Sequence, residues 1–234
     1  MSVLLLRLVA PMQSWGTQSR FSHRDTGLEP SKSGIVGVLC AALGRSRDEP
    51  LADLGSLGMG IRVNREGRIE RDFHTAGGGK LNGRDYGVAK VNGARPETVI
   101  SHRDYLADAD FLVALSGEDE LIGRLHEAVK RPVFPLYLGR KAFVPSLPVF
   151  DPDGPRDGND VESVLRAEPW RRPKRNPPER LRLVLEANDR LEGEVRRDHP
   201  NTFVSDRRSF ALRYVRTAWI DNPSETLPAP GYEP

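Results

Sequence analysis

The chain has 234 residues, of which 38% are apolar and 29% charged, a composition typical of a soluble globular protein of one domain or of one domain with a small appendage. Its apolar runs are shorter than the ~20 residues that a membrane-spanning helix needs, and no cleavage signal follows the apolar start, so we expect neither secretion nor a membrane partner. A single cysteine, Cys40, excludes an internal disulfide and a cysteine-rich zinc site and fits a reducing cytoplasm.

Basic and acidic residues are nearly balanced but unevenly distributed. Thirty-five Lys and Arg against 33 Asp and Glu give a net charge of only +2. Residues 101–130 contain three basic and seven acidic side chains, whereas 166–182 contain seven basic and two acidic ones. Such segregation allows one basic face without a basic protein, although most charge runs are simply solvated surface.

The first elements in chain order are a strand and a helix. Residues 3–9 are leucine-rich and β-branched and are followed by Pro11, a pattern typical of a strand buried on both faces. Ser31 precedes an apolar stretch over residues 35–44, where we expect a helix capped by Ser31 and closed by Gly44. This helix is apolar almost all round, so it packs against neighbours on most sides.

The middle of the chain contains a hairpin signal and a long irregular stretch. Residues 59–63 and 69–73 are extended patterns on either side of a turn signal at 64–67, which predicts a β-hairpin. From about 74 to 100 the pattern stops, and the sequence is rich in glycine, asparagine and scattered basic residues. This stretch is too long for an ordinary connection and indicates a functional excursion or a disordered loop.

The elements that follow complete an alternating order of strands and helices. Residues 111–115 predict a strand, residues 116–119 resemble a capping box, and a helix continues to Lys130 before Pro132. A further extended segment is expected over 133–138. The order is compatible with an α+β fold built on a ferredoxin-like βαββαβ unit over residues 1–150.

The composition changes at Asp151. Turn-rich polar segments there flank expected short strands at 181–185, 203–204 and 209–220. We expect residues 151–234 to form a small, mostly β C-terminal region that ends in a proline-rich tail.

Several catalytic and cofactor motifs are absent from the sequence. It contains no phosphate-binding GxxxxGK[ST] loop, no dinucleotide fingerprint, no HExxH pair and no G-x-S-x-G turn, and its histidines lack metal-ligand spacing. We therefore expect no cofactor and no metal. His23 is adjacent to Arg24 in the sequence and is followed by Lys32. An imidazole can act as the base in metal-free RNA cleavage while cations stabilise the phosphorane, although a loop histidine is more often a surface or hydrogen-bonding group.

Three segments carry groups suited to single-stranded RNA. Gln13, Ser14 and Trp15 follow the first strand and offer an amide, a hydroxyl and an aromatic ring; Trp15 either stacks on a base or closes the core. Residues 31–34 place hydroxyls, a cation and free N–H groups at a helix N-terminus, which is an anion site unless it is a plain capped helix. Residues 139–141 combine a glycine, which permits close backbone approach, with two basic residues.

The sequence resembles the Cas5-type subunits of the type I-E CRISPR surveillance complex Cascade, members of the RAMP superfamily. The likeness covers roughly residues 3–150 in order and spacing. It lies in the segments Leu4–Gly16, Pro30–Gly37, Arg71–Thr75, Tyr105–Phe111 and Pro135–Lys141. The C-terminal third resembles the family less distinctively, in its length and in a basic β segment with Arg207, Arg208, Arg213 and Arg216.

The resemblance implies a fold and a set of partners. Family members have a ferredoxin-like, RRM-related body from which a long β-hairpin thumb emerges, and here the thumb corresponds to residues 74–100. They cap the end of Cascade that holds the 5′ handle of the crRNA, and they contact the CasC backbone subunit, the large CasA subunit and, through the assembly, target DNA. The thumb would wedge against the first displaced nucleotide.

The resemblance also implies RNA-binding residues. Those in the three segments above are Gln13, Ser14, Trp15, Ser31, Lys32, Ser33, Gly34, Gly139, Arg140 and Lys141; those in the thumb are His74, Thr75, Lys80 and Lys90; three further arginines are Arg20, Arg24 and Arg103.

The resemblance bears on catalysis as well. Type I-E members leave cleavage of precursor RNA to a separate subunit, so we expect a non-catalytic protein. The alternative is a metal-independent endoribonuclease that processes CRISPR repeat RNA with His23 or His74.

Overall fold

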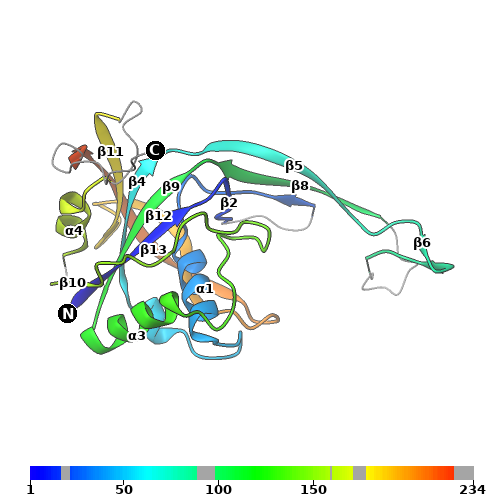
Figure 1. Ribbon diagram of the computed structural model, residues 1–234, viewed down its shortest axis with the longest axis horizontal. Coiled ribbons are helices and arrows are strands. Elements are labelled where there is room, and N and C mark those ends of the chain that lie inside the picture. Colours follow the sequence, from blue (N-terminus) through cyan, green and yellow to red (C-terminus); the bar gives the residue numbers. More distant parts are fainter. Residues whose placement is uncertain (17–21, 89–97, 159, 171–177, 224–234) are drawn as a thin grey trace, which may run out of the picture.

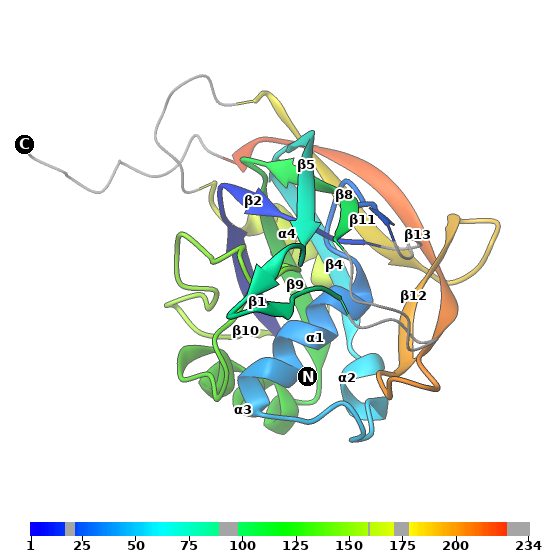
Figure 2. The same cartoon turned by 90° about the vertical axis from the view of Figure 1, so that its right-hand side faces the viewer.

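The computed structural model describes residues 1–16, 22–88, 98–158, 160–170 and 178–223. It has an α+β body built on a curled sheet, from which a long two-stranded ribbon projects (Figure 1). Turned by 90°, the same structure presents the ribbon end-on in front of the body (Figure 2). Within these ranges, no helix combines the length and the hydropathy that crossing a lipid bilayer requires.

The body is organised around a sheet of seven strands. Their order is β10-β1-β9-β4-β11-β13-β12, and all neighbouring strands are antiparallel. The strands are β1 (Ser2–Val9), β4 (Gly58–Arg65), β9 (Asp110–Gly117), β10 (Arg156–Asp157), β11 (Arg180–Ala187), β12 (Glu194–Thr202) and β13 (Ser209–Asp221).

Helices cover both faces of this sheet. α1 (Lys32–Leu43), α2 (Ala52–Gly55) and α3 (Asp119–Lys130) contribute to the larger core cluster on one face, and α4 (Val161–Ala167) lies on the other. β1 is buried on both sides, as predicted, because Leu4, Leu6 and Leu8 enter the larger cluster while Val3 and Leu5 pack in the smaller one. A strand enclosed in this way reads as a continuous apolar run.

The ribbon belongs to a second, smaller sheet. β5 (Arg68–Ala76) pairs with β8 (Val99–Ala107), and β2 (Met12–Gln13) and β3 (His23–Arg24) also pair with β8. Farther out, β6 (Lys80–Leu81) pairs with β7 (Arg84–Asp85).

The two predicted helices are present, but only the first has the caps that the sequence predicts. The Ser31 hydroxyl accepts a hydrogen bond from the Gly34 N–H at 3.2 Å, and Gly44 closes α1 in the left-handed conformation at φ +76°. In α3 the N-cap is Glu118, whose side chain makes no capping bond, so the predicted capping box is wrong. The Asp119 carboxylate instead accepts hydrogen bonds from the Met1 amine and the Ser2 hydroxyl, 2.9 and 2.7 Å away.

The predicted hairpin over residues 59–73 is also wrong. β4 pairs with β9 and β11 in the main sheet, whereas β5 pairs with β8 in the ribbon. The turn after β4 therefore leads the chain from a buried sheet into an exposed one. Local turn residues cannot reveal this, because both strands find their partners far along the chain.

Two expected short strands do not form. The backbone N–H groups of Val133 and Phe134 donate to the Ala42 and Ala41 carbonyls, so residues 133–138 close the end of α1 instead of joining the sheet. Residues 203–204 lie in the turn between β12 and β13. That turn starts where the Thr202 hydroxyl accepts a hydrogen bond from the Val204 N–H.

The C-terminal region shares the sheet and the core of the N-terminal region. β11 pairs with β4 from Arg182 opposite Val63 to Leu185 opposite Gly60, and Val184 and Val215 belong to the larger core cluster. The sheet and the larger core therefore continue across residue 150. The division of the chain into two regions at that residue stays a prediction. The proline-rich tail from 224 onward lies outside the described residues.

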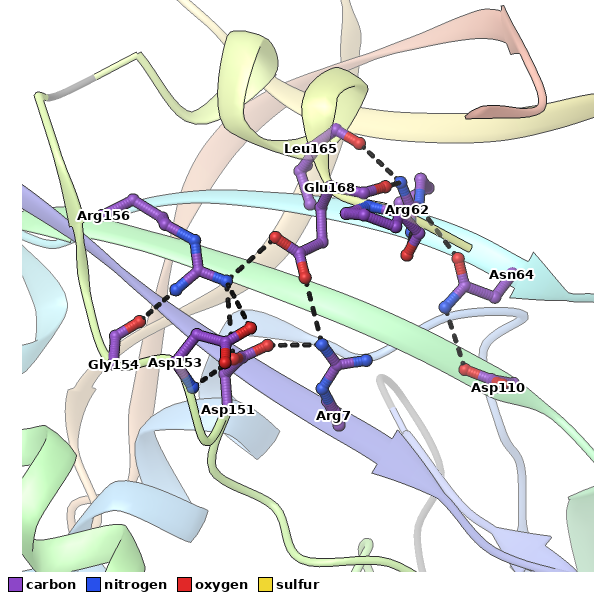
Figure 3. A network of polar contacts seen from close by, with 11 residues as sticks. Arg7, Arg62, Asn64, Asp110, Asp151, Asp153, Gly154, Arg156, Leu165 and Glu168 are labelled. Carbon is purple, nitrogen blue, oxygen red and sulfur yellow. Dashed lines mark hydrogen bonds and ion pairs between the residues drawn. The ribbon is translucent and has the colours of Figure 1, made fainter. Parts of the chain in front are cut away.

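One buried and two partly buried arginines attach the segment 151–169 to the sheet (Figure 3). Arg7 of β1 is bonded to Asp151 and, at 3.1 Å, to Glu168, and Arg156 is bonded to the same two acids. Arg62 of β4 donates to the carbonyls of residues 165, 168 and 169 at the end of α4, and its burial lowers its pKa to about 10. These bonds replace the hydration that the buried charges lose.

Candidate nucleic-acid interface

The base of the ribbon is where distant parts of the sequence meet. β5 and β8 pair over nine positions, from Arg68 opposite Ala107 to Ala76 opposite Val99. β3 lies parallel to β8, with His23 opposite His102 and Arg24 opposite Arg103. Side chains on successive residues of a strand point to opposite faces, so one face of this sheet carries the histidine pair and the other the arginine pair.

A third arginine joins the pair formed by Arg24 and Arg103. The Arg140 guanidinium donates to the Asp104 carbonyl oxygen at 2.7 Å and lies over the Phe143 ring, with its Cζ 5.4 Å from the ring centre. Burial lowers the pKa of Arg140, and the charges of Arg103 and Arg24 lower it further. These three residues, which we call the arginine cluster, are therefore close enough to repel one another.

Gly139 places Arg140 in this cluster. Its φ of +99° suits glycine, and a Cβ at this position would lie 1.9 Å from the Ser14 carbonyl oxygen. The Ser14 N–H donates to the Leu138 carbonyl at 3.0 Å, and the Ser14 hydroxyl lies 3.5 Å from the Asp104 carbonyl. The loop after β1 and the 139–141 loop, which the sequence marked separately, thus contact each other at the edge of β8.

The acids near the arginine cluster balance only part of its positive charge. The Asp104 carboxylate accepts hydrogen bonds from Arg71 at 2.7 and 3.4 Å and lies 3.3 Å from His23 Nε2; the bond from Arg71 is the main cause of its lowered pKa. Arg103 donates to the Ser101 hydroxyl at 2.9 Å. Asp72 lies opposite Arg103 in β5, and its charge and that of Asp104 partly offset the repulsion at Arg140. Among the described residues, neither Arg24 nor Arg103 forms an ion pair with an acid, so three cations face two nearby acids and an anion has cations to bind here.

Gln13 and Trp15 belong to the interior of the protein. The Gln13 amide donates to the Leu8 and Ala109 carbonyls at 3.0 and 2.9 Å, and its oxygen accepts from the Trp15 ring nitrogen at 3.2 Å. Gln13 is 0% and Trp15 1% exposed. Of the two roles considered for Trp15, the structure supports closing the core, and the amide fastens the loop rather than presenting itself to a ligand.

The start of α1 holds an internal carboxylate. The Lys32 N–H donates to Asp198 Oδ2 at 2.9 Å, and the Lys32 ammonium binds Glu186 and the Leu57 carbonyl, both at 2.8 Å. Ser31 caps the helix and lies 3.4 Å from the Ser33 hydroxyl. The helix N-terminus attracts an anion as expected, but Asp198 of β12 fills that place, and Lys32 is only 5% exposed.

The first turn of α1 also packs tightly. A Cβ on Gly34 would lie 2.8 Å from Cε3 of the Trp15 ring. This glycine therefore makes room for the buried tryptophan.

The other predicted site residues lie along the ribbon or outside the described residues. His74 and Thr75 are in the outer half of β5, and Lys80 begins β6. Lys141 is exposed beside Arg140. Arg20 and Lys90 lie outside the described ranges. For all of the predicted residues, contact with RNA stays a prediction; the structure brings Ser14, Arg24, Arg103, Gly139 and Arg140 together and places Gln13, Trp15 and Lys32 away from the surface.

Sequence reasoning missed the opposite face of the ribbon. Phe73 is 60% exposed and its ring meets the His102 ring edge-on, with centroids 5.6 Å apart. Ile69 and Ile100 are also exposed, and Arg71 completes the face beside Asp104. Alternation within β5 could have indicated one shared face for residues 69, 71 and 73, but their pairing with β8 could not be read locally.

Comparisons with known proteins agree on one family. A family model described as CRISPR-associated protein (Cas5) matches residues 3–216. The "CRISPR system Cascade subunit CasD" of Escherichia coli (strain K12) is 34% identical over 164 residues, which cover 64% of this chain and 70% of that protein.

Solved structures are similar over nearly the full length. One described as "Crystal structure of Cas protein" has 43% identity and a TM-score of 0.74, covering 94% of this chain and 95% of its own. A chain of a "CRISPR RNA-guided surveillance complex" has 35% identity and a TM-score of 0.80, covering 99% of this chain and 95% of its own.

Proposed function

The chain belongs to the Cas5 family of CRISPR-associated proteins, and on that premise we propose that it is the Cascade subunit that binds the 5′ handle of the crRNA. The arginine cluster is the observation that carries this assignment. Three guanidinium groups from β3, β8 and the 139–141 loop lie together, and no acid among the described residues forms an ion pair with Arg24 or Arg103. The phosphates of a single RNA strand supply the missing negative charge.

The fold supports the same role. The strand order β1-β9-β4, with α1 between β1 and β4 and α3 after β9, matches the first three strands of a ferredoxin-like βαββαβ unit. In this interpretation the β5–β8 ribbon and the β6–β7 end form the family's thumb. The cluster lies at the base of that thumb, where a bound strand would meet both the ribbon and the body.

Assembly with other subunits belongs to the same proposal. A Cascade subunit works within a larger RNA-guided complex, so crRNA and further Cascade subunits are its partners. We place the CasC backbone subunit and the large CasA subunit next to it, with target DNA reached through the assembly. The exposed ribbon face with Ile69, Phe73 and Ile100 offers apolar area to such neighbours or to unstacked bases.

The subunit binds RNA without cleaving it. His23 and His102 are neighbours across β3 and β8, and Asp104 lies 3.3 Å from His23, an arrangement that metal-free cleavage could use. Asp104 is also the acceptor for Arg71, and its backbone oxygen is the acceptor for Arg140. These bonds give the residue a structural role at the base of the ribbon, which favours strand binding over catalysis.

The experiment that tests the proposal uses the recombinant chain with two RNAs. An RNA ending in the handle should bind, and a full repeat RNA in EDTA should remain intact. A product that ends in a 2′,3′-cyclic phosphate and disappears in a His23→Ala variant would establish the endoribonuclease instead. Absence of binding together with failure to co-purify with a uniform small RNA from the host would refute RNA binding itself.

A further inference from the structure

Arg182 of β11 binds two carboxylates that belong to separate segments of the chain. Its Nε and Nη2 donate to the two oxygens of Glu66 at 2.7 and 2.9 Å, and its Nη1 donates to Glu29 at 2.9 Å. Burial lowers the pKa of Arg182, but the bonds to Glu66 and Glu29 outweigh burial and raise the pKa above its ordinary value. One guanidinium thus connects two acids, and we call the three residues the Arg182 bridge.

The two acids of the bridge adjoin the strands on the two edges of β8. Glu66 lies in the turn where the chain leaves β4 and enters β5, and Glu29 lies in the loop between β3 and α1. His102 of β8 pairs with Phe73 of β5 on one edge and with His23 of β3 on the other. The bridge therefore attaches both neighbours of β8 to a strand of the main sheet.

Glu29 is the buried acid of the bridge. It is 5% exposed, whereas the side chain of Glu66 is 53% exposed. The second carboxylate oxygen of Glu29 accepts a hydrogen bond from Arg196 of β12. Cations from two strands of the main sheet thus hold the loop that follows β3, and they replace the hydration that the buried carboxylate loses.

Strand β3 holds Arg24 opposite another cation by few backbone contacts. It pairs with β8 at only two positions, and Arg24 faces Arg103 at one of them. Like charges opposite each other destabilise a strand pair, and the two acids nearby do not balance the three cations of the arginine cluster. The loop after β3 supplies further attachment, because the Gly27 N–H donates to the Trp15 carbonyl at 2.9 Å and Glu29 binds the main sheet.

We propose that Arg182 is a positioning residue for RNA binding, which acts through its two carboxylates. By holding β3 and β5 on the two edges of β8, the bridge keeps Arg24 and Arg103 together in the arginine cluster. Arg182 itself does not contact the RNA. The inference rests on the proposed function and extends it, because a C-terminal strand then serves an RNA site built from the N-terminal part of the chain.

The first test removes the buried acid of the bridge. Glu29→Gln takes away a negative charge, so charge alone would strengthen RNA binding. We expect the opposite, because displacement of Arg24 removes one phosphate contact, which lowers the log–log salt slope by about 0.7 and the affinity at 0.1 M salt about fivefold. Fluorescence anisotropy of the full chain with the RNA ending in the handle measures both, under conditions where urea titration shows the variant to be folded.

Two further variants separate positioning from general effects of charge and stability. Glu162 also binds two arginines, Arg166 and Arg216, but it lies in α4 on the other face of the main sheet. Glu162→Gln is therefore the matched control, and it should leave the salt slope unchanged. Glu66→Gln removes the exposed acid of the bridge, so it should spare the fold and lower the slope in the same direction as Glu29→Gln.

A double-mutant cycle shows whether the bridge acts through Arg24. In an Arg24→Gln background, Glu29→Gln should weaken RNA binding no further, because the contact that it positions is already lost. The inference is overturned if Glu29→Gln lowers the free energy of unfolding but leaves the salt slope unchanged, or if its effect on affinity adds in full to that of Arg24→Gln.

The single arginine variants distinguish this failure from failure of the proposed function. If Arg24→Gln weakens RNA binding while Glu29→Gln and Glu66→Gln do not, only the role of the bridge is refuted. If Arg24→Gln and Arg140→Gln both leave RNA binding unchanged, the arginine cluster is not the RNA site, and the role of the bridge is refuted with it.

Discussion

Two groups of basic side chains in this protein differ in what balances their charge. At the start of α1, Lys32 and Arg213 are buried and bonded to Glu186 and Asp198. At the base of the ribbon, Arg24 and Arg103 have no ion pair with an acid among the described residues, and Arg140 bonds to a backbone carbonyl. The first group holds the protein together, and the second is available to an external anion.

The largest effect should come from breaking the internal group. Asp198→Ala leaves Arg213 buried without its carboxylate and the Lys32 N–H without an acceptor, so the free energy of unfolding should fall by about 3–5 kcal/mol in a urea titration. RNA affinity measured under conditions where the variant stays folded should be unchanged. A clear loss of RNA affinity in the folded variant would contradict the division between the two groups.

The same carboxylate makes stability depend on pH. Burial alone would raise the pKa of Asp198, but its bonds to Arg213 and Lys32 outweigh burial and hold the pKa below its ordinary value. This contribution is fully present above the unfolded pKa of about 3.9 and is lost as the pH falls toward the folded pKa. As the pH falls below about 5, the free energy of unfolding should therefore decrease less for Asp198→Asn than for the wild type, as urea titrations at several pH values would measure.

The external group should have the next largest effect, on RNA binding. Replacing Arg24, Arg103 and Arg140 together by Gln removes up to three phosphate contacts, which lowers the log–log salt slope by about 2 and the affinity at 0.1 M salt by roughly a hundredfold. The matched control is Lys32→Met, which also removes a cation of the predicted site. It should lower stability and leave the slope unchanged, and equal slopes for the two variants would make the two groups equivalent.

This contrast also marks how far the sequence could predict the site. The strand at 3–9, the capped helix and the special role of Gly139 all follow from local patterns, and the structure confirms them. The burial of Lys32 and its contacts with carboxylates could not be predicted locally, because Glu186 and Asp198 come from β11 and β12, far along the chain. A helix start that attracts anions looks the same whether an internal Asp198 or a phosphate fills it.

The hairpin and the arginine cluster show the same limit. A turn between two extended runs predicts that they pair with each other, yet β4 and β5 pair with strands distant in sequence. The parallel contact of β3 with β8 joins Arg24 to Arg103 through a connection that no local rule describes. The longer strands and helices could therefore be predicted from local patterns, whereas their partners and the resulting charge balance could not.

Two glycine substitutions should have smaller effects on stability, and only one of them should also weaken RNA binding. Gly139→Ala forces a side chain toward the Ser14 carbonyl at an unfavourable φ, so it should cost about 1–3 kcal/mol of stability and also weaken RNA binding by displacing Arg140. Gly34→Ala presses on the Trp15 ring and should cost a similar amount through overpacking, without affecting RNA binding in the folded protein. Urea titration and anisotropy on both variants measure the difference.

The smallest expected effect distinguishes the two glycines of the first part of α1. A Cβ on Gly37 would meet no atom within 4 Å, so Gly37→Ala should gain about 0.5–1 kcal/mol of stability, the ordinary advantage of alanine within a helix. The sequence alone treats Gly34 and Gly37 as equivalent. If Gly37→Ala were as destabilising as Gly34→Ala, crowding by Trp15 would not be the cause, and the loss at Gly34 would reflect the helix backbone instead of its packing against the Trp15 ring.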